Sequence, residues 1–176
     1  MAKFAQVFQV DSPFGGANTF FHRLLLFVIG FLGLTLALLS KRGENKSMTG
    51  KAKILIAEDE PIMAKLLKDE LEEAGFEIVI ALDGVEALGK IQTDKPDLMI
   101  LDLIMPLKNG FEVLEEMHKS QGLEMMPIIV LTNLGQDKEA ERAISLGAKD
   151  FLIKANVNIK DVVAKVKKYV QDMRQT

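Results

Sequence analysis

From residue 52 onward, short apolar runs alternate with longer amphipathic stretches, and this alternation is the feature that most restricts the fold. The runs are apolar at successive positions and not at every second one, which is typical of strands buried on both faces of a parallel sheet. Such a sheet needs a crossover connection, usually a helix, between consecutive strands. The five runs span residues 54–57, 78–81, 98–101, 128–131 and 151–153.

The stretches between these runs have the spacing of helices that pack by one face. Valines recur at helical intervals between residues 162 and 170. Pro61 is typical of the first turn of a helix, and Gly75 of a position just after its end. We predict an α/β fold: a doubly wound five-stranded parallel sheet in the flavodoxin-like order 2-1-3-4-5, with helices on both faces. The second and fourth helices, over residues 85–91 and 138–146, are expected to be short.

Polar side chains follow four of the five apolar runs. Glu58 and Asp59 follow the first, Asp102 the third, Thr132 the fourth and Lys154 the fifth. In the order 2-1-3-4-5 the first and third strands are neighbours at the switch point, where ligands bind outside the carboxyl ends of the strands. We therefore expect these side chains to meet at one edge of the sheet.

Three neighbouring carboxylates raise one another's pKa unless they share protons or bind a cation. Mg²⁺ suits such a site because it takes one or two carboxylates and keeps waters that phosphate oxygens can replace. Lys154 would add a fixed positive charge and Thr132 a hydroxyl donor. Asp102 then has the features of a nucleophile that accepts a phosphoryl group as an acyl phosphate.

Each of these residues also has a purely structural interpretation. Glu58 and Asp59 would favour the dipole at a helix start, Thr132 would cap the fourth helix, and Lys154 would be a solvated surface lysine. Asp102 fits such an interpretation least, since it is a lone acid between apolar residues. A charge in that place is costly unless it is paired or lies at an exposed strand end.

Four segments resemble the receiver domain of two-component response regulators over about residues 52–172. They are ILIAEDEP around the first acidic pair, the D-x-x-M-P-x-x-N-G pattern from Asp102 to Gly110, VLTN ending at Asn133, and FLIK ending at Lys154. Their order and spacing together are more specific than any one of them. The resemblance implies a single-domain receiver over residues 48–176.

The resemblance also assigns roles to the site residues. It implies that Asp102 is the phosphoacceptor. Mg²⁺ would be held directly by Asp59, Asp102 and the backbone carbonyl of Ile104, and by Glu58 through a water molecule. Thr132 and Lys154 would contact the phosphoryl oxygens, and Phe151 would be the aromatic that turns inward when Thr132 moves.

The sequence departs from the family pattern near this site. The lysine is followed by Ala155 and not by proline, so we expect a trans peptide or a rearranged loop there. Asn133 replaces a small residue and would narrow access to the phosphate. Ile104 and Leu134 are apolar at the two positions that vary in the family, and neither can orient an attacking water. We predict slow self-dephosphorylation.

These features favour a phosphorylation-dependent switch that a histidine kinase or phosphotransfer protein modifies and that an unidentified protein partner reads. We do not expect an enzyme with turnover, nor an output domain. The alternative is a Mg²⁺-dependent phosphohydrolase with an aspartyl-phosphate intermediate; it lacks a second acid two positions after Asp102, where Ile104 stands. A flavodoxin-like mononucleotide binder would need hydrogen-bond donors after the first strand, where the sequence has acids instead, and the sequence has no P-loop motif either.

The composition excludes several other classes. The chain of 176 residues has no cysteine, two histidines and a net charge of −3. A disulfide scaffold, a thiolate zinc site and a cysteine nucleophile are therefore ruled out. Nucleic-acid binding is not expected, because the sequence has neither a helix-turn-helix segment nor a basic stripe. His118 is expected on the surface of the third helix.

Residues 1–47 form an extension of different character, with five Lys/Arg and two Asp/Glu against 17 and 23 in residues 48–176. Its residues 24–39 are apolar and uncharged, slightly short of the roughly 20 residues that usually span a membrane. Lys41, Arg42 and Lys46 follow, which would place a receiver domain in the cytoplasm, tethered if the segment is an anchor. A translation start at Met48, with residues 1–47 mis-assigned, explains the sequence equally well; a cleaved signal peptide or a core helix fits it less well.

Overall fold

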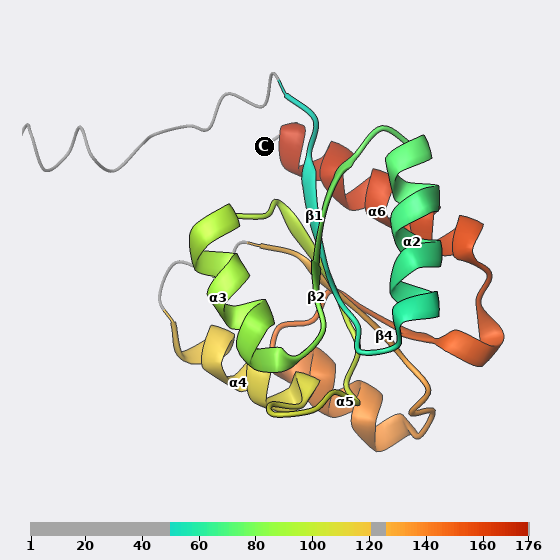
Figure 1. Cartoon of the computed structure of the whole chain (residues 1–176). Helices are drawn as coiled ribbons and strands as arrows, with labels where there is room; N and C mark the ends of the chain where they lie inside the picture. Colours follow the sequence, from blue (N-terminus) through green and yellow to red (C-terminus); the bar gives the residue numbers. More distant parts are fainter. Residues whose placement is uncertain (1–49, 121–125, 176) are drawn as a thin grey trace, which may run out of the picture. The chain divides into compact units, whose positions relative to one another are not determined.

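The computed structural model of the chain describes residues 50–120 and 126–175. Within these residues, five strands form one sheet in the order β2-β1-β3-β4-β5, and every neighbouring pair is parallel. This arrangement confirms the predicted fold (Figure 1). The strands are β1 (Lys53–Ala57), β2 (Glu77–Ala81), β3 (Leu98–Leu101), β4 (Ile128–Thr132) and β5 (Asp150–Ile153).

Three strands begin one residue earlier than the apolar runs predict. Lys53 pairs with Glu77 in the register of β1 and β2, and their side chains form an ion pair of 3.0 Å. Asp150 pairs with Ile129 between β5 and β4. A strand continues where its backbone finds a partner, even when the side chain reaches solvent. Hydrophobicity alone therefore underestimates the sheet at these ends.

Five α-helices and one short 3-10 helix connect and follow the strands in the described part of the chain. The helix after β2 is longer than predicted at both ends, and it begins at Gly84 because the carboxylate of Asp83 accepts a hydrogen bond of 2.8 Å from the backbone of Glu86. Gly75, with a φ of +97°, follows the first helix as expected. The helices are α2 (Pro61–Glu73), α3 (Gly84–Asp94), α4 (Gly110–Lys119), α5 (Asp137–Ser145), η1 (Lys154–Asn156) and α6 (Ile159–Arg174).

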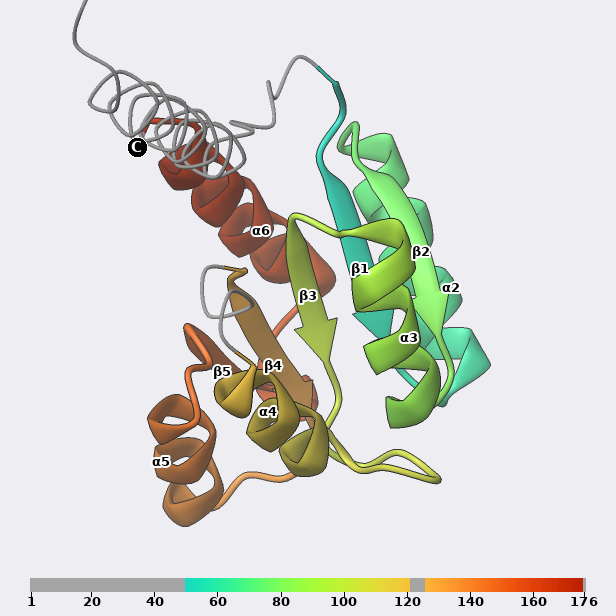
Figure 2. The same ribbon diagram turned by 90° about the vertical axis from the view of Figure 1, so that its left-hand side faces the viewer.

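The helices cover both faces of the sheet. Figures 1 and 2 show α2 and α6 on one face and α3, α4 and α5 on the other. Since successive strand residues point to opposite faces, Ile54 and Ile56 pack against α2 and α6, whereas Leu55 and Ala57 pack on the α3–α5 side. The described residues of both cores belong to one compact unit.

No helix within residues 50–120 and 126–175 is long and apolar enough to cross a membrane. The extension over residues 1–47, with its apolar segment 24–39, lies outside the described residues. Its interpretation and the domain boundary at residue 48 stay predictions.

Candidate functional site

The carboxyl ends of β1 and β3 bring three carboxylates together. Glu58 and Asp59 follow β1 directly, and Asp102 follows β3. The backbone of Asp102 donates a hydrogen bond of 2.9 Å to the carbonyl of Ala57, which extends the pairing of the two strands. Carboxylate oxygens of the three acids all lie within 4.8 Å of one another. The structure thus places them on one edge, as the strand order predicts.

Two of the three acids are buried. Glu58 is 2% exposed and Asp102 is 4% exposed, whereas Asp59 is open to solvent. Burial raises the pKa of Glu58 above its ordinary value, and it outweighs the opposing effect of Lys154. Neither Glu58 nor Asp59 lies within α2, whose N-cap is Glu60, so these acids are not first-turn residues of a helix.

Lys154 supplies the positive charge at this edge. Its ammonium group lies 2.7 Å from a carboxylate oxygen of Glu58 and 2.5 Å from one of Asp102. Its side chain is 5% exposed, which excludes the interpretation as a solvated surface lysine. Burial acts to lower the pKa of Lys154, but its hydrogen bonds to Asp102 and Glu58 prevail and the pKa is raised. The lysine therefore stays charged.

The segment that carries this lysine keeps trans peptides, as predicted from Ala155. There is no cis bond in residues 50–120 and 126–175, and Lys154 begins the short helix η1 that follows β5. The strand end sets the position of the lysine backbone, and the long side chain reaches the acids without a proline.

Thr132 and Phe151 lie on the two strands at the other side of the site. Thr132 is the last residue of β4 and is fully buried. Its hydroxyl accepts a hydrogen bond of 3.4 Å from the backbone of Leu134, and α5 is capped at Gln136, so Thr132 is not the cap of that helix. Phe151 is half-buried on β5 and packs against the core on the α3–α5 side.

The donor set at this edge fits Mg²⁺. It consists of carboxylate oxygens, which are hard ligands, and the exposed Asp59 leaves one side open to water and to a phosphate. Ile104, the expected carbonyl ligand, lies beside the acids, because its backbone N–H donates a hydrogen bond of 3.1 Å to Asp102. With no cysteine in the chain and no histidine in the cluster, a softer metal has less to bind here.

The loop from β3 to α4 is held by contacts that sequence reasoning missed. A Cβ on Gly110 would lie 2.3 Å from the carbonyl oxygen of Asp102, and one on Gly84 would lie 2.3 Å from that of Lys108. Leu107 has a φ of +62°, which is unusual for a bulky residue. Gly110 belongs to the D-x-x-M-P-x-x-N-G pattern, so a signal existed for it, but the backbone conformation of Leu107 has none.

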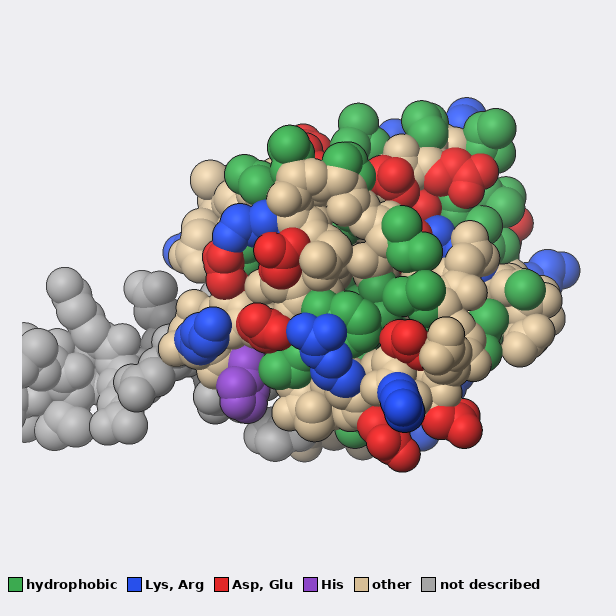
Figure 3. All heavy atoms as spheres, turned by 90° about the horizontal axis from the view of Figure 1, so that it is seen from below, with side chains coloured by type: hydrophobic (Ala, Val, Ile, Leu, Met, Phe, Trp, Pro, Cys, Tyr) green, Lys and Arg blue, Asp and Glu red, His purple; other side chains and the backbone are tan. Residues whose placement is uncertain are grey.

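Several apolar side chains are exposed around this edge. Figure 3 looks onto the carboxyl ends of the strands and shows hydrophobic side chains among acidic and basic ones. By position they belong to the first two turns of α2, to the start of α3 and to the loop from β3 to α4. They are Ile62, Leu66, Leu82, Val85, Ile104 and Leu107. His118 lies exposed in the last turn of α4, as expected.

Fold and site together define a doubly wound α/β domain with a buried lysine and a cluster of three carboxylates at its switch point. The chain matches the response regulator receiver domain over residues 54–167. It belongs to this family, which places it among the proteins of two-component signal transduction.

Curated relatives of this chain are transcriptional regulators. It is 36% identical over 115 residues to the alkaline phosphatase synthesis transcriptional regulatory protein PhoP of Bacillus subtilis, a match that covers 65% of this chain and 47% of that protein. It is also 36% identical over 115 residues to the phosphate regulon transcriptional regulatory protein PhoB of Rhizobium meliloti, covering 65% and 50%. The match thus spans about half the length of these relatives.

Solved structures of receiver domains have the same fold. The receiver domain of Francisella response regulator 1452 superposes with a TM-score of 0.66 at 28% identity, covering 70% of this chain and 99% of that one. A CheY-like receiver domain protein from Methanospirillum hungatei gives 0.65 at 28% identity, covering 72% and 100%.

Proposed function

We propose that the chain is a phosphorylation-activated switch in which Asp102 accepts a phosphoryl group from a histidine kinase or a phosphotransfer protein. The observation that carries this proposal is the setting of Asp102, which is buried, adjoins two further carboxylates and is ion-paired with Lys154. A buried acid with both a cation site and a fixed ammonium group beside it suits the chemistry of an acyl phosphate.

In the proposed transfer, a carboxylate oxygen of Asp102 attacks the phosphorus of a protonated phosphohistidine. The new O–P bond forms while the N–P bond of the donor breaks, and the donor leaves with the bonding electrons as neutral imidazole. Asp59, Asp102 and the carbonyl of Ile104 would hold Mg²⁺, with Glu58 acting through a water molecule. When bound, this ion neutralises charge on the phosphoryl oxygens.

Lys154 and Thr132 would then contact the phosphoryl oxygens. Lys154 already lies 2.5 Å from a carboxylate oxygen of Asp102, so it needs little movement to reach a group attached there. Thr132 would turn its hydroxyl toward the phosphoryl group, and Phe151 would turn inward with it. Of the residues of α5, the helix after Thr132, only Ala143 is fully buried, which supports a helix that moves readily.

We propose that the phosphorylated state is read by protein association. The exposed apolar side chains around the site support this, since they offer contacts to a partner that approaches Asp102. In this proposal the domain catalyses its own modification and does not turn over a substrate. Ile104 is apolar and 52% exposed, so it cannot serve as the acid–base group that the alternative phosphohydrolase would need.

The proposal is tested by incubating the chain with radiolabelled acetyl phosphate, with and without Mg²⁺. We expect an acid-stable, base-labile label that requires Mg²⁺ and is absent in Asp102→Asn. Glu112→Gln, which changes an exposed carboxylate on α4, is the control that keeps the label. Continuous release of phosphate without accumulation of label would instead support the hydrolase.

A further inference from the structure

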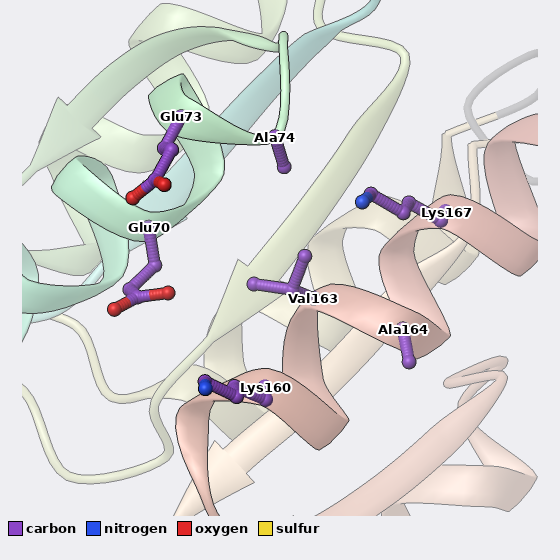
Figure 4. A pocket seen from close by; sticks show the side chains of 7 residues that line it. All are labelled: Glu70, Glu73, Ala74, Lys160, Val163, Ala164 and Lys167. Atoms are coloured by element: carbon purple, nitrogen blue, oxygen red, sulfur yellow. The ribbon is translucent and has the colours of Figure 1, made fainter.

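A groove of about 350 Å³ runs between α2 and α6, on the face of the sheet opposite α3, α4 and α5. Ala74, Val163 and Ala164 also line it, and Val163 points into the space between the two helices (Figure 4). Glu70 and Glu73 of α2 form one wall, and Lys160 and Lys167 of α6 form the other (Figure 4). The groove is separate from the phosphoacceptor site, and none of its residues has a role in the proposed function.

The two walls carry opposite charges that have no partner in the described part of the chain. Of the four wall residues, none forms an ion pair there, although residues close by do. Lys68 pairs with Glu72 on α2, and Lys165 of α6 pairs with Asp150 of β5 at 2.5 Å. Four unpaired charges, acidic on one wall and basic on the other, are complementary to a surface with the reverse order of signs.

A second copy of the same groove, rotated to face the first, presents its charges in that reverse order. We propose that it is an interface with a second copy of this chain, related by a two-fold axis that runs along the groove. This rotation places the acidic wall of one copy against the basic wall of the other, twice in the dimer. An axis across the groove would instead oppose acid to acid and lysine to lysine, so the charges select one orientation.

The arrangement also keeps the matching residues at similar heights. Figure 4 shows Glu73 and Lys167 toward one end of the groove and Glu70 and Lys160 toward the other. A rotation about an axis along the groove leaves these heights unchanged, so each pair of walls meets in register. The carboxyl edges of both sheets then point the same way, and the face that carries α5 and Phe151 stays free.

Charge reversal tests this dimer in the full chain. Glu70→Lys with Glu73→Lys makes both walls basic, and Lys160→Glu with Lys167→Glu makes both acidic. We expect each double variant to self-associate at least about tenfold more weakly than the unchanged chain in sedimentation velocity, because like charges then face each other. An equimolar mixture of the two variants should restore the dimer as a heterodimer, which shows that both are folded.

Two controls separate the groove from other contacts. Lys138→Glu with Glu141→Lys reverses exposed charges on α5 and should leave self-association unchanged. Self-association of the unchanged chain should weaken in about 1 M salt, where the screening length is about 3 Å. Three results would overturn the proposal. They are self-association that the groove variants leave unchanged, a mixture of the two double variants that stays monomeric, and an unchanged chain that is monomeric at every concentration.

A cysteine probe tests the geometry separately. The chain has no cysteine, so Ala164→Cys introduces a single thiol on α6, at an exposed residue that lines the groove. A short bis-maleimide should crosslink two copies of this variant, and Gln92→Cys on α3 should not be crosslinked at the same concentration. Equal crosslinking of the two variants would contradict an interface at the groove.

Discussion

Ionisation of the buried Glu58 destabilises the folded state. Its pKa is raised by burial, so it binds a proton more tightly in the folded than in the unfolded chain. Such a group stabilises the fold below its unfolded pKa, and this contribution is lost as the pH rises through the folded pKa. Without Mg²⁺, the contribution of Glu58 to the free energy of unfolding should therefore fall as the pH rises from about 4.5.

Glu58→Gln should remove that fall, because the amide keeps an acceptor for Lys154 and cannot ionise. The stability of the variant relative to the unchanged chain should increase with pH in urea titrations made in EDTA. Glu141→Gln, at an exposed position of α5, serves as the matched change and should alter nothing. A variant that loses stability relative to the unchanged chain as the pH rises would contradict this linkage.

We propose that Ile104 determines how long the phosphoryl group stays on Asp102. Its exposed, apolar side chain lies two residues after Asp102 and cannot hold a water for attack on phosphorus. Ile104→Asn should shorten the phosphorylated lifetime by roughly tenfold, less than the about 100-fold or more that a proton-transferring side chain contributes, because an amide only positions the water. The decay of label after removal of acetyl phosphate measures this, with Ile104→Val as the conservative control. An unchanged or longer lifetime in Ile104→Asn would show that another residue controls hydrolysis.

The start of α4 fixes the loop that carries Ile104. A methyl group on Gly110 would lie 2.3 Å from the carbonyl oxygen of Asp102 and 2.8 Å from the Cα of Leu103, and both are backbone atoms that cannot yield cheaply. Gly110→Ala should lower the free energy of unfolding by about 2–3 kcal/mol. The same change at Gly89 in α3 meets nothing within 4 Å and should raise it by about 0.5–1 kcal/mol. Equal effects at the two positions would contradict the packing described here.

Helix α5 is tied to α4 by one arginine. The guanidinium of Arg142 lies 2.8 Å from a carboxylate oxygen of Glu115 and 4.2 Å from the ring centroid of Phe111. Exposed contacts of this kind contribute about 0.5–1 kcal/mol each. Arg142→Ala should therefore speed amide hydrogen exchange in α5 by roughly tenfold and leave α6 unchanged. Exchange that increases equally in both helices would indicate global destabilisation.

At the scale of the whole molecule, the sequence predicted best the elements whose side chains are all buried. The apolar runs identify the strands because both faces of the sheet are buried, and the acids Glu58, Asp59 and Asp102 stand out because they follow those runs. The strand order came from the known doubly wound pattern. Once that order is assumed, the three acids are expected to meet at one edge of the sheet, and they do so in the structure.

Other features depend on contacts between distant segments and could not be predicted. The close approach of Gly84 to Lys108, the left-handed backbone at Leu107 and the burial of Lys154 between two carboxylates each require the packed fold. The charges on the walls of the α2–α6 groove look in sequence like ordinary solvated residues. Their arrangement by sign appears only when the two helices lie side by side.

The central claim is that Asp102, together with the proposed Mg²⁺ site beside it, is the residue that accepts the phosphoryl group. Borohydride reduces an acyl phosphate to an alcohol, so it converts a phosphorylated aspartate to homoserine, which mass spectrometry locates in the sequence. After treatment with acetyl phosphate, we predict homoserine at position 102 alone, formed with Mg²⁺ and lost in EDTA. Homoserine at position 59 or elsewhere, or equal conversion without a divalent ion, would contradict the account.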